Sequence, residues 1–367
     1  MFAGEIGLRI FYPQNLNVWT STRDGMSTHW PNTTKYFPQF GHEVRINSLG
    51  MRDRERKLEK GDGVFRILLL GDSFMEAFQV KFEDSFPHLL EDLFSNRVNF
   101  PVEVINPSVS GWGTDYQLTY LMRYGVKLKP DLILVAMTLH NDVSENLREE
   151  FHFMQDGQLY EKSRQEIPLR DFVILRAKGL LALNSHLFQL IRFYVNLRND
   201  NKAGKELDAH VANLISQTSN DRIRLGWDVT QRLLEKTQSV GEQIGARLVV
   251  CLLPLRIQVS QEHLSHFIRS QGLDINNISL EKPQQVMKQW GRNRETEIID
   301  LLPGFRKWME SGDGSLFLQN EGHWNEAGHR LAASIVSEEL ISRNVVTRDT
   351  LKQEQSLGTV HYPRHKT

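Results

Sequence analysis

The chain has 367 residues, of which 40% are hydrophobic and 24% are charged, and its formal net charge is −1. This is the composition of a globular protein, and the balanced charge argues against nucleic acid or an anionic membrane as a partner. The single cysteine, Cys251, excludes an internal disulfide and a cysteine-based metal site, and its apolar neighbours predict a position in the core.

Residues 1–60 are rich in Asn, Thr, Arg and Pro and have little periodicity, which predicts an irregular N-terminal extension packed on the main domain. No stretch approaches the ~20 apolar residues of a membrane-spanning helix. The first residues, MFAGEIGLRIF, lack the charged leader and apolar core of a signal peptide. The location therefore stays open between a cytoplasmic protein and an extracytoplasmic one whose membrane anchor precedes this sequence.

Five short apolar runs follow, at residues 65–71, 102–109, 131–138, 247–254 and 296–302. They are continuously apolar rather than alternating, as expected for strands covered on both faces. Helical patterns at 85–96, 114–125, 224–245 and 325–342 separate or follow them, and Asn325 is a suitable N-cap for the last helix. This alternation predicts an α/β fold with three α/β/α layers around a flavodoxin-like, five-stranded parallel sheet.

The main domain is expected to span residues 61–342. Within it, residues 143–222 contain one or two apolar helical patterns and a polar break, and we interpret them as a helical insertion that forms a packed cap. Residues 343–367 are polar and aperiodic, which predicts a flexible tail.

Polar or glycine-bearing groups stand at the ends of the predicted strands, where open parallel sheets bind their ligands. They are Gly71-Asp72-Ser73, Ser110-Gly111-Trp112-Gly113 and His140-Asn141-Asp142, and Asn320-Glu321-Gly322-His323 precedes the last helix. A serine needs a base before it can attack a carbonyl, and a histidine supported by a carboxylate supplies one. The resulting oxyanion needs donors, which glycine N–H groups and an asparagine amide provide.

Four blocks in this order resemble the SGNH or GDSL hydrolases, a family named for Ser, Gly, Asn and His in separate blocks. The blocks are GDSF at 71–74, NPSVSG at 106–111, Asn141-Asp142, and EGHWN at 321–325, and the resemblance extends upstream to INSLGMRDRE. It implies an α/β/α fold, no metal or cofactor, and hydrolysis or transfer of acyl esters through a serine-bound intermediate.

Carried over by position, the resemblance makes Ser73 the nucleophile and His323 the general base. The oxyanion hole would comprise the N–H groups of Ser73 and Gly111 and the side chain of Asn141. Glu321 would orient His323, although the family usually has Asp there, and Asn320 is the alternative neighbour. His140, Trp112 and Trp324 are expected to line the substrate site, whereas His329 and Asp72 are interpreted as structural.

The sequence therefore predicts a serine esterase that cleaves short-chain or O-acetyl esters of a small molecule or a glycan. Three alternatives stay open: an O-acyltransferase acting on a polysaccharide, a carbohydrate-binding member without turnover, and an unrelated phosphate or cofactor binder. The last is disfavoured because GDSFMEAF lacks a glycine-rich phosphate loop. Composition and pattern give no oligomeric state.

Overall fold

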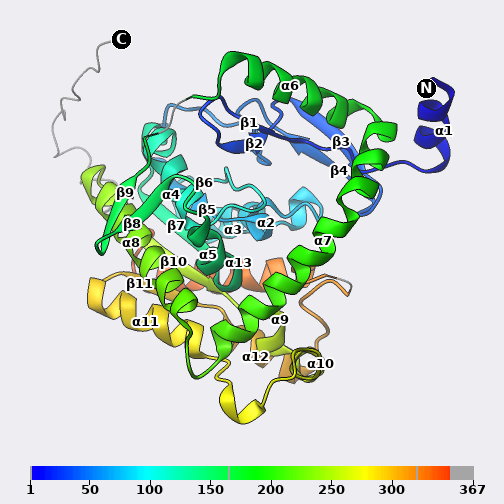
Figure 1. The fold of residues 1–367 in the computed structure, drawn as a ribbon. Helices are drawn as coiled ribbons and strands as arrows, with labels where there is room; N and C mark the ends of the chain where they lie inside the picture. The colour runs from blue at the N-terminus through cyan, green and yellow to red at the C-terminus, as the bar shows by residue number, and fades with distance from the viewer. Residues whose placement is uncertain (1, 164–165, 320, 348–367) are drawn as a thin grey trace.

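A five-stranded parallel sheet forms the centre of the chain in a computed structural model, which describes residues 2–163, 166–319 and 321–347. Across the sheet the strands are β6 (Val102–Ile105), β5 (Phe65–Leu70), β7 (Leu132–Thr138), β10 (Arg247–Leu253) and β11 (Glu297–Asp300) (Figure 1). Taken in chain order, this arrangement is 2-1-3-4-5, the order of flavodoxin-like sheets. The predicted fold class is confirmed, and each predicted apolar run contains one of the five strands.

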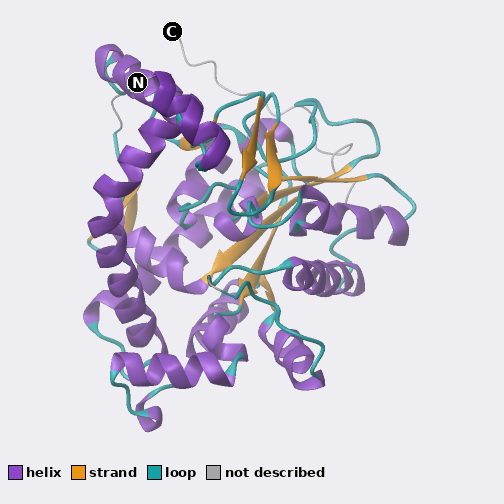
Figure 2. Ribbon diagram, turned by 90° about the vertical axis from the view of Figure 1, so that its right-hand side faces the viewer, coloured by secondary structure: helices purple, strands orange, loops and turns teal. Residues whose placement is uncertain are grey.

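Helices cover both faces of the sheet (Figure 2). On one face α3 (Phe86–Arg97), α12 (Leu302–Ser311) and α13 (Glu326–Ser342) pack against side chains such as Ile67 and Leu69. On the other, α4 (Thr114–Arg123), α8 (Asp221–Gln243) and α11 (Lys282–Arg294) pack against Leu68 and Leu70. Alternate residues of β5 thus enter different apolar clusters, which explains why the strand is apolar throughout.

Shorter helices complete the domain near the ends of the strands. They are α2 (Ser73–Glu76), α5 (Leu139–Glu145), α9 (Arg256–Val259) and α10 (Gln261–Gln271), with 3₁₀ helices at Phe82–Asp84, Gly125–Leu128, Asn146–Arg148 and Ile275–Asn277. Asn325 caps α13 as predicted, because its side chain accepts the N–H of Gly328 at 3.0 Å.

The N-terminal segment is more regular than its composition indicates. It contains α1 (Phe2–Phe11), the antiparallel pair β1 (Trp19–Ser21) and β2 (Ser27–His29), and a second antiparallel pair, β3 (Thr33–Phe37) and β4 (His42–Ile46). The irregular extension expected for residues 1–60 is therefore corrected. These strands are too short for alternation to stand out in the sequence, and they pack around Val18, Val44 and Phe78 of a separate apolar cluster.

The segment between β7 and β10 contains a hairpin as well as helices. The hairpin consists of β8 (His152–Gln155) and β9 (Gln158–Glu161), and it precedes α6 (Leu169–Asn184) and the long α7 (His186–Ile215). Figure 1 shows α6 lying over the N-terminal strands and α7 running from there to the opposite end of the molecule. Most of the tail expected at 343–367 lies outside the described residues.

Within the described ranges, none of the helices combines the length and apolar character needed to cross a bilayer.

Candidate active site

Ser73 lies where β5 ends and α2 begins. Gly71 makes the turn, and a Cβ at this position would lie 2.4 Å from Cγ of Met75, so a larger residue does not fit. Asp72 caps α2 by accepting the N–H of Phe74 at 3.0 Å. Ser73 is the first residue of the helix, so its own N–H has no acceptor within the helix and can serve an incoming ligand.

His323 faces Ser73 from a distant part of the chain. Its Nε2 lies 2.8 Å from Oγ of Ser73, which is hydrogen-bond distance. The loop that carries His323 is fixed by a bridge between Phe317 and Trp324, and the imidazole packs against the ring of Phe74 with 4.9 Å between centroids. The serine and histidine predicted from separate blocks are therefore brought together in the geometry that a proton transfer requires.

Glu321 lies on the other side of the same imidazole. Its Oε2 is 3.5 Å from Nδ1 of His323, and among the described residues Nδ1 has no hydrogen-bond partner. The two groups attract each other electrostatically, but the separation exceeds that of an ordinary N–H to oxygen hydrogen bond. Asn320, the alternative partner, lies outside the described residues.

The residues predicted for the oxyanion hole lie at the same edge of the sheet as Ser73. Gly111 follows β6 with a φ of 81°, a left-handed conformation that glycine adopts without strain. Asn141 stands in the first turn of α5, after β7, and its Nδ2 donates to Oδ2 of Asp72 at 3.1 Å. Asp72, which directly precedes Ser73, thereby orients the side-chain amide of Asn141.

Buried acids lie behind Asn141. Burial raises the pKa of Asp72 and raises that of Asp142 well above the usual range, and Asp142 accepts the N–H of Thr138 at 2.7 Å. Burial, together with the neighbouring charge of Asp72, raises the pKa of Glu145 to about 8.

Three aromatic residues expected to line the site occupy different environments. Trp112 and Trp324 are 1% and 0% exposed, so both rings are buried in the core, which corrects the expectation that they line an open substrate site. Partly accessible His140 has a buried Nδ1 without a hydrogen-bond partner in the described part of the chain. Burial, with the nearby charges of His210 and His323, lowers its pKa to about 3, so His140 is neutral near pH 7.

A buried carboxylate that the sequence did not single out connects the N-terminal strands with the glycine loop. Oε1 of Glu76 accepts the indole N–H of Trp19 at 2.7 Å and the N–H of Ser110 at 3.2 Å, and it lies 2.7 Å from Nε2 of His29. Ser110 precedes Gly111, and Glu76 lies one helical turn after Ser73. Only the proximity of Glu76 to GDS in the sequence could have pointed to it.

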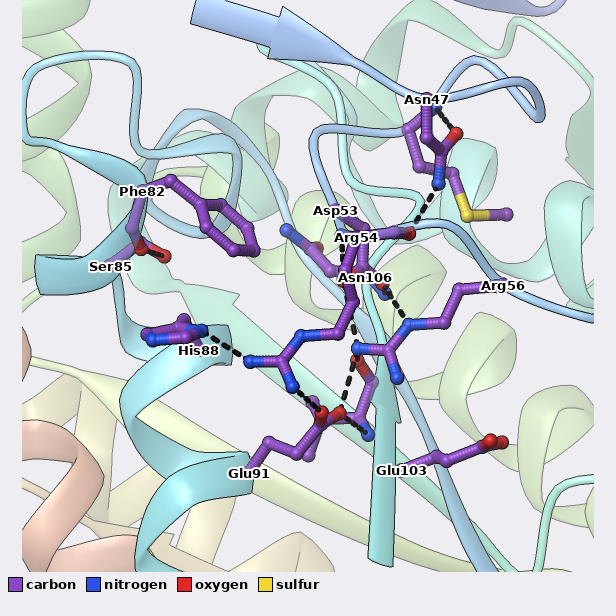
Figure 3. A network of polar contacts seen from close by, with 12 residues as sticks. Asn47, Asp53, Arg54, Arg56, Phe82, Ser85, His88, Glu91, Glu103 and Asn106 are labelled. Carbon is purple, nitrogen blue, oxygen red and sulfur yellow. Dashed lines mark hydrogen bonds and ion pairs between the residues drawn. The ribbon is translucent and has the colours of Figure 1, made fainter.

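The upstream stretch INSLGMRDRE and the adjoining Arg56 take part in a network of polar contacts with the second block (Figure 3). Arg56 donates to Oδ2 of Asp53 at 2.9 Å and to Oε2 of Glu91 at 2.7 Å. Asp53 in turn accepts the N–H of Asn106 at 3.3 Å, and Asn106 donates to the carbonyl of Met75 at 2.8 Å. This network fixes the start of the second block against α2, directly beside the serine turn.

One family model matches part of the chain. The family described as "SGNH hydrolase-like domain, acetyltransferase AlgX" matches residues 217–365, less than half of the chain, a range that includes His323 but not Ser73. No curated protein matches the sequence.

Similar solved structures are distant in sequence. A two-domain esterase active on acetylated mannans, co-crystallized with mannopentaose, is 10% identical with a TM-score of 0.40, over 83% of this chain and 53% of that one. The acetyl xylan esterase AlAXEase is 11% identical with a TM-score of 0.43, over 75% of this chain and 100% of that one. A lipase/acylhydrolase from Enterococcus faecalis is 14% identical with a TM-score of 0.39, over 76% and 96%. This chain thus spans about half the length of the two-domain esterase. The family match over residues 217–365 supports the resemblance read from the sequence blocks, since this part of the chain is similar to an SGNH hydrolase-like domain.

Proposed function

We propose that this protein is a serine ester hydrolase that acts through an acyl-enzyme on Ser73. The observation that carries the proposal is the 2.8 Å contact between Nε2 of His323 and Oγ of Ser73 at the carboxyl edge of the sheet. A serine hydroxyl with an imidazole at this distance is an activated nucleophile rather than an ordinary capping residue.

In the proposed cycle, Oγ of Ser73 attacks the ester carbonyl while Nε2 of His323 takes the hydroxyl proton. The negative charge on the carbonyl oxygen is stabilised by the N–H groups of Ser73 and Gly111 and by the amide of Asn141. His323 then gives its proton to the leaving alcohol, and the C–O bond breaks to form the acyl-enzyme. Water repeats the sequence and releases the acid, with Glu321 supporting the imidazolium through its charge.

The first test is turnover of a short-chain aryl ester by a Ser73→Ala variant. We expect the rate to fall by at least about 10³-fold, whereas Ser239→Ala, a serine substitution on α8, leaves it unchanged. An organophosphonate should label the wild-type protein once, at Ser73, as seen by mass spectrometry of the peptides. Unlabelled Ser73 with no turnover would instead favour the carbohydrate-binding alternative.

A second candidate is transfer of an acetyl group to a polysaccharide hydroxyl in place of water. It is favoured by the family match, because the matched family is described as that of an acetyltransferase and the match includes His323 and Glu321. Neutral oligosaccharides and an aryl acetate donor can be incubated with the protein, and acetylated glycan measured by mass spectrometry. Glycan acetylation that is lost in Ser73→Ala would identify a transferase, and release of acetate alone would identify a hydrolase.

We also propose that residues 61–342 form the catalytic domain, with 1–60 and 143–222 as additions to it. Supporting this division, Ser73, His323 and the five strands of the parallel sheet fall between 61 and 342. Because Trp19 and His29 contact Glu76, the N-terminal addition would be needed for an active enzyme.

A further inference from the structure

Exposed apolar side chains gather on one part of the surface. Of 20 large apolar side chains that are exposed among the described residues, 14 lie on α1 and Tyr12, on α6, and on the first third of α7. They are Ile6, Ile10, Phe11, Tyr12, Leu169, Val173, Ile174, Leu175, Leu180, Leu181, Ile191, Phe193, Tyr194 and Val195. Helix α7 contacts both α1 and α6, and Figure 1 shows α1, α6 and the start of α7 at the same end of the molecule. We call this surface the apolar face.

The position of α1 in this surface is fixed by specific contacts. Glu5 accepts the backbone N–H groups of His186 and Leu187, each at 3.0 Å, and thereby caps the N-terminus of α7. Arg9 donates to the carbonyl of Asn184 at 2.8 Å, at the end of α6. These contacts use the polar side of α1 and leave Ile10 and Phe11 65% and 84% exposed.

Helix α6 is apolar on both sides but is covered on only one. Its inner side packs on the N-terminal strands, where the guanidinium of Arg176 lies 3.7 Å from the ring centroid of Trp30 and Gly179 approaches the same ring. Its outer side carries Ile174 and Leu181, which are 44% and 53% exposed. A helix in water normally turns a polar side outward, so the packed cap expected from the sequence accounts for only half of this helix.

The charged residues of the apolar face indicate what kind of partner covers it. Among the described residues of this face, Arg9, Arg170, Lys178 and Arg192 are exposed against the exposed acid Asp171, and the partly exposed Glu5 pairs with Arg9 at 2.9 Å. The cations still outnumber the acids by four to two. The net charge of the whole chain, −1, does not reveal this local excess of positive charge. Proteins that bind anionic membranes typically use helices that lie parallel to the membrane surface and carry both apolar side chains and cations.

A cavity of about 420 Å³ lies between α6, α7 and the strands β1 and β2, beside the apolar face. Leu175, Ala182, Phe188 and Trp19 are among its apolar lining residues, and Lys178 and Arg192 also line it. An apolar cavity with two cations suits an amphiphile that has an acyl chain and an anionic headgroup. From the face and the cavity together, we propose that the apolar face binds the surface of a lipid bilayer containing anionic lipids.

Vesicle flotation tests the proposal with the intact chain. We expect binding to vesicles of phosphatidylcholine with phosphatidylglycerol, and much weaker binding to phosphatidylcholine alone. The combined change Phe11→Ser, Ile174→Ser and Phe193→Ser should weaken binding by at least about tenfold, because it removes one apolar side chain from each helix. Ile275→Ser, which changes a residue that is 59% exposed and lies outside the face, is the matched control.

A second pair of variants tests the charge. Lys178→Glu with Arg192→Glu should abolish the preference for phosphatidylglycerol, whereas Lys236→Glu on α8 should not. Hydrolysis of a soluble aryl ester should be unchanged in every variant, so that failure of the membrane proposal is separable from failure of the esterase proposal.

Two results would overturn the inference. One is equal flotation of wild type and the triple-serine variant. The other is a concentration-dependent dimer in sedimentation without lipid, abolished by the same three serines, since it would show that a second copy covers the apolar face.

Discussion

The carboxylate of Glu321 lies 3.5 Å from Nδ1 of His323, on the side of the imidazole opposite Ser73. Both side chains are partly exposed, at 32% and 25%, so water screens their attraction. This relationship differs from a triad in which a buried carboxylate accepts the histidine N–H. Ser73, His323 and Glu321 are arranged in a row, but the contact between His323 and Glu321 is longer than a hydrogen bond.

The loose contact predicts a small effect of Glu321→Gln. An exposed ion pair contributes about 1 kcal/mol or less, so kcat for an aryl ester should fall by about tenfold at most. The comparison is His323→Ala, for which we expect a loss of at least about 10³-fold. A loss of about 10⁴-fold in Glu321→Gln would mean that the carboxylate closes onto Nδ1 during turnover.

Replacing Asn141 should affect the rate more than substrate binding. An oxyanion donor acts on the charge that develops in the transition state, so Asn141→Ala should lower kcat by about 10²–10³-fold and leave KM nearly unchanged. Asn96→Ala, on the exposed side of α3, serves as the control. A change confined to KM would show that Asn141 contacts the substrate in its ground state instead.

Glu76 should contribute to both stability and turnover. Glu76→Ala removes the acceptor of two partly buried N–H groups, those of Trp19 and Ser110, and leaves Nε2 of the buried His29 without its partner at 2.7 Å. A buried polar group left without a partner costs about 1–3 kcal/mol. We expect a lower midpoint of thermal denaturation and a lower kcat, because the loop that carries Gly111 loses its attachment to α2. Trp19→Phe removes only one donor and should keep most of the activity. Unaltered stability in Glu76→Ala would contradict the role of this carboxylate.

Glu145 should make the protein less stable as the pH rises. Its pKa is raised to about 8 in the folded state, chiefly by burial, from a usual value of 4.5. Between these values the folded state holds more protons than the unfolded state, so this residue's stabilising contribution is complete below about pH 4.5. It is lost on approach to pH 8, with a slope of at most about 1.4 kcal/mol per pH unit.

Urea denaturation at several pH values measures this effect. Glu145→Gln stays neutral throughout and should lose less stability than wild type between pH 5 and pH 8. Parallel curves for the two proteins would show that Glu145 does not hold a proton in the folded state.

The hydrophobicity pattern and the residue types of short segments were sufficient to predict the sheet and the four blocks. Continuous apolar runs such as FRILLLG occur because a strand between two helical layers has no face in water, and this requirement is visible in one short segment. Once the strands are parallel, their carboxyl ends share one edge, so Ser73, Gly111 and Asn141 must gather there. The approach of His323 to Ser73 followed from the family resemblance, and the structure agrees.

Contacts between segments that are distant in sequence decided the rest. The distance from Glu321 to His323 depends on the path of one loop, the burial of Trp112 and Trp324 depends on packing, and the role of Glu76 depends on donors from Trp19 and Ser110. The sequence of α6 shows that it is apolar, but only the folded chain shows which side is covered. Burial and hydrogen bonding depend on which distant segments folding brings into contact. The strands, the blocks and their order depend only on residues that are neighbours in the sequence.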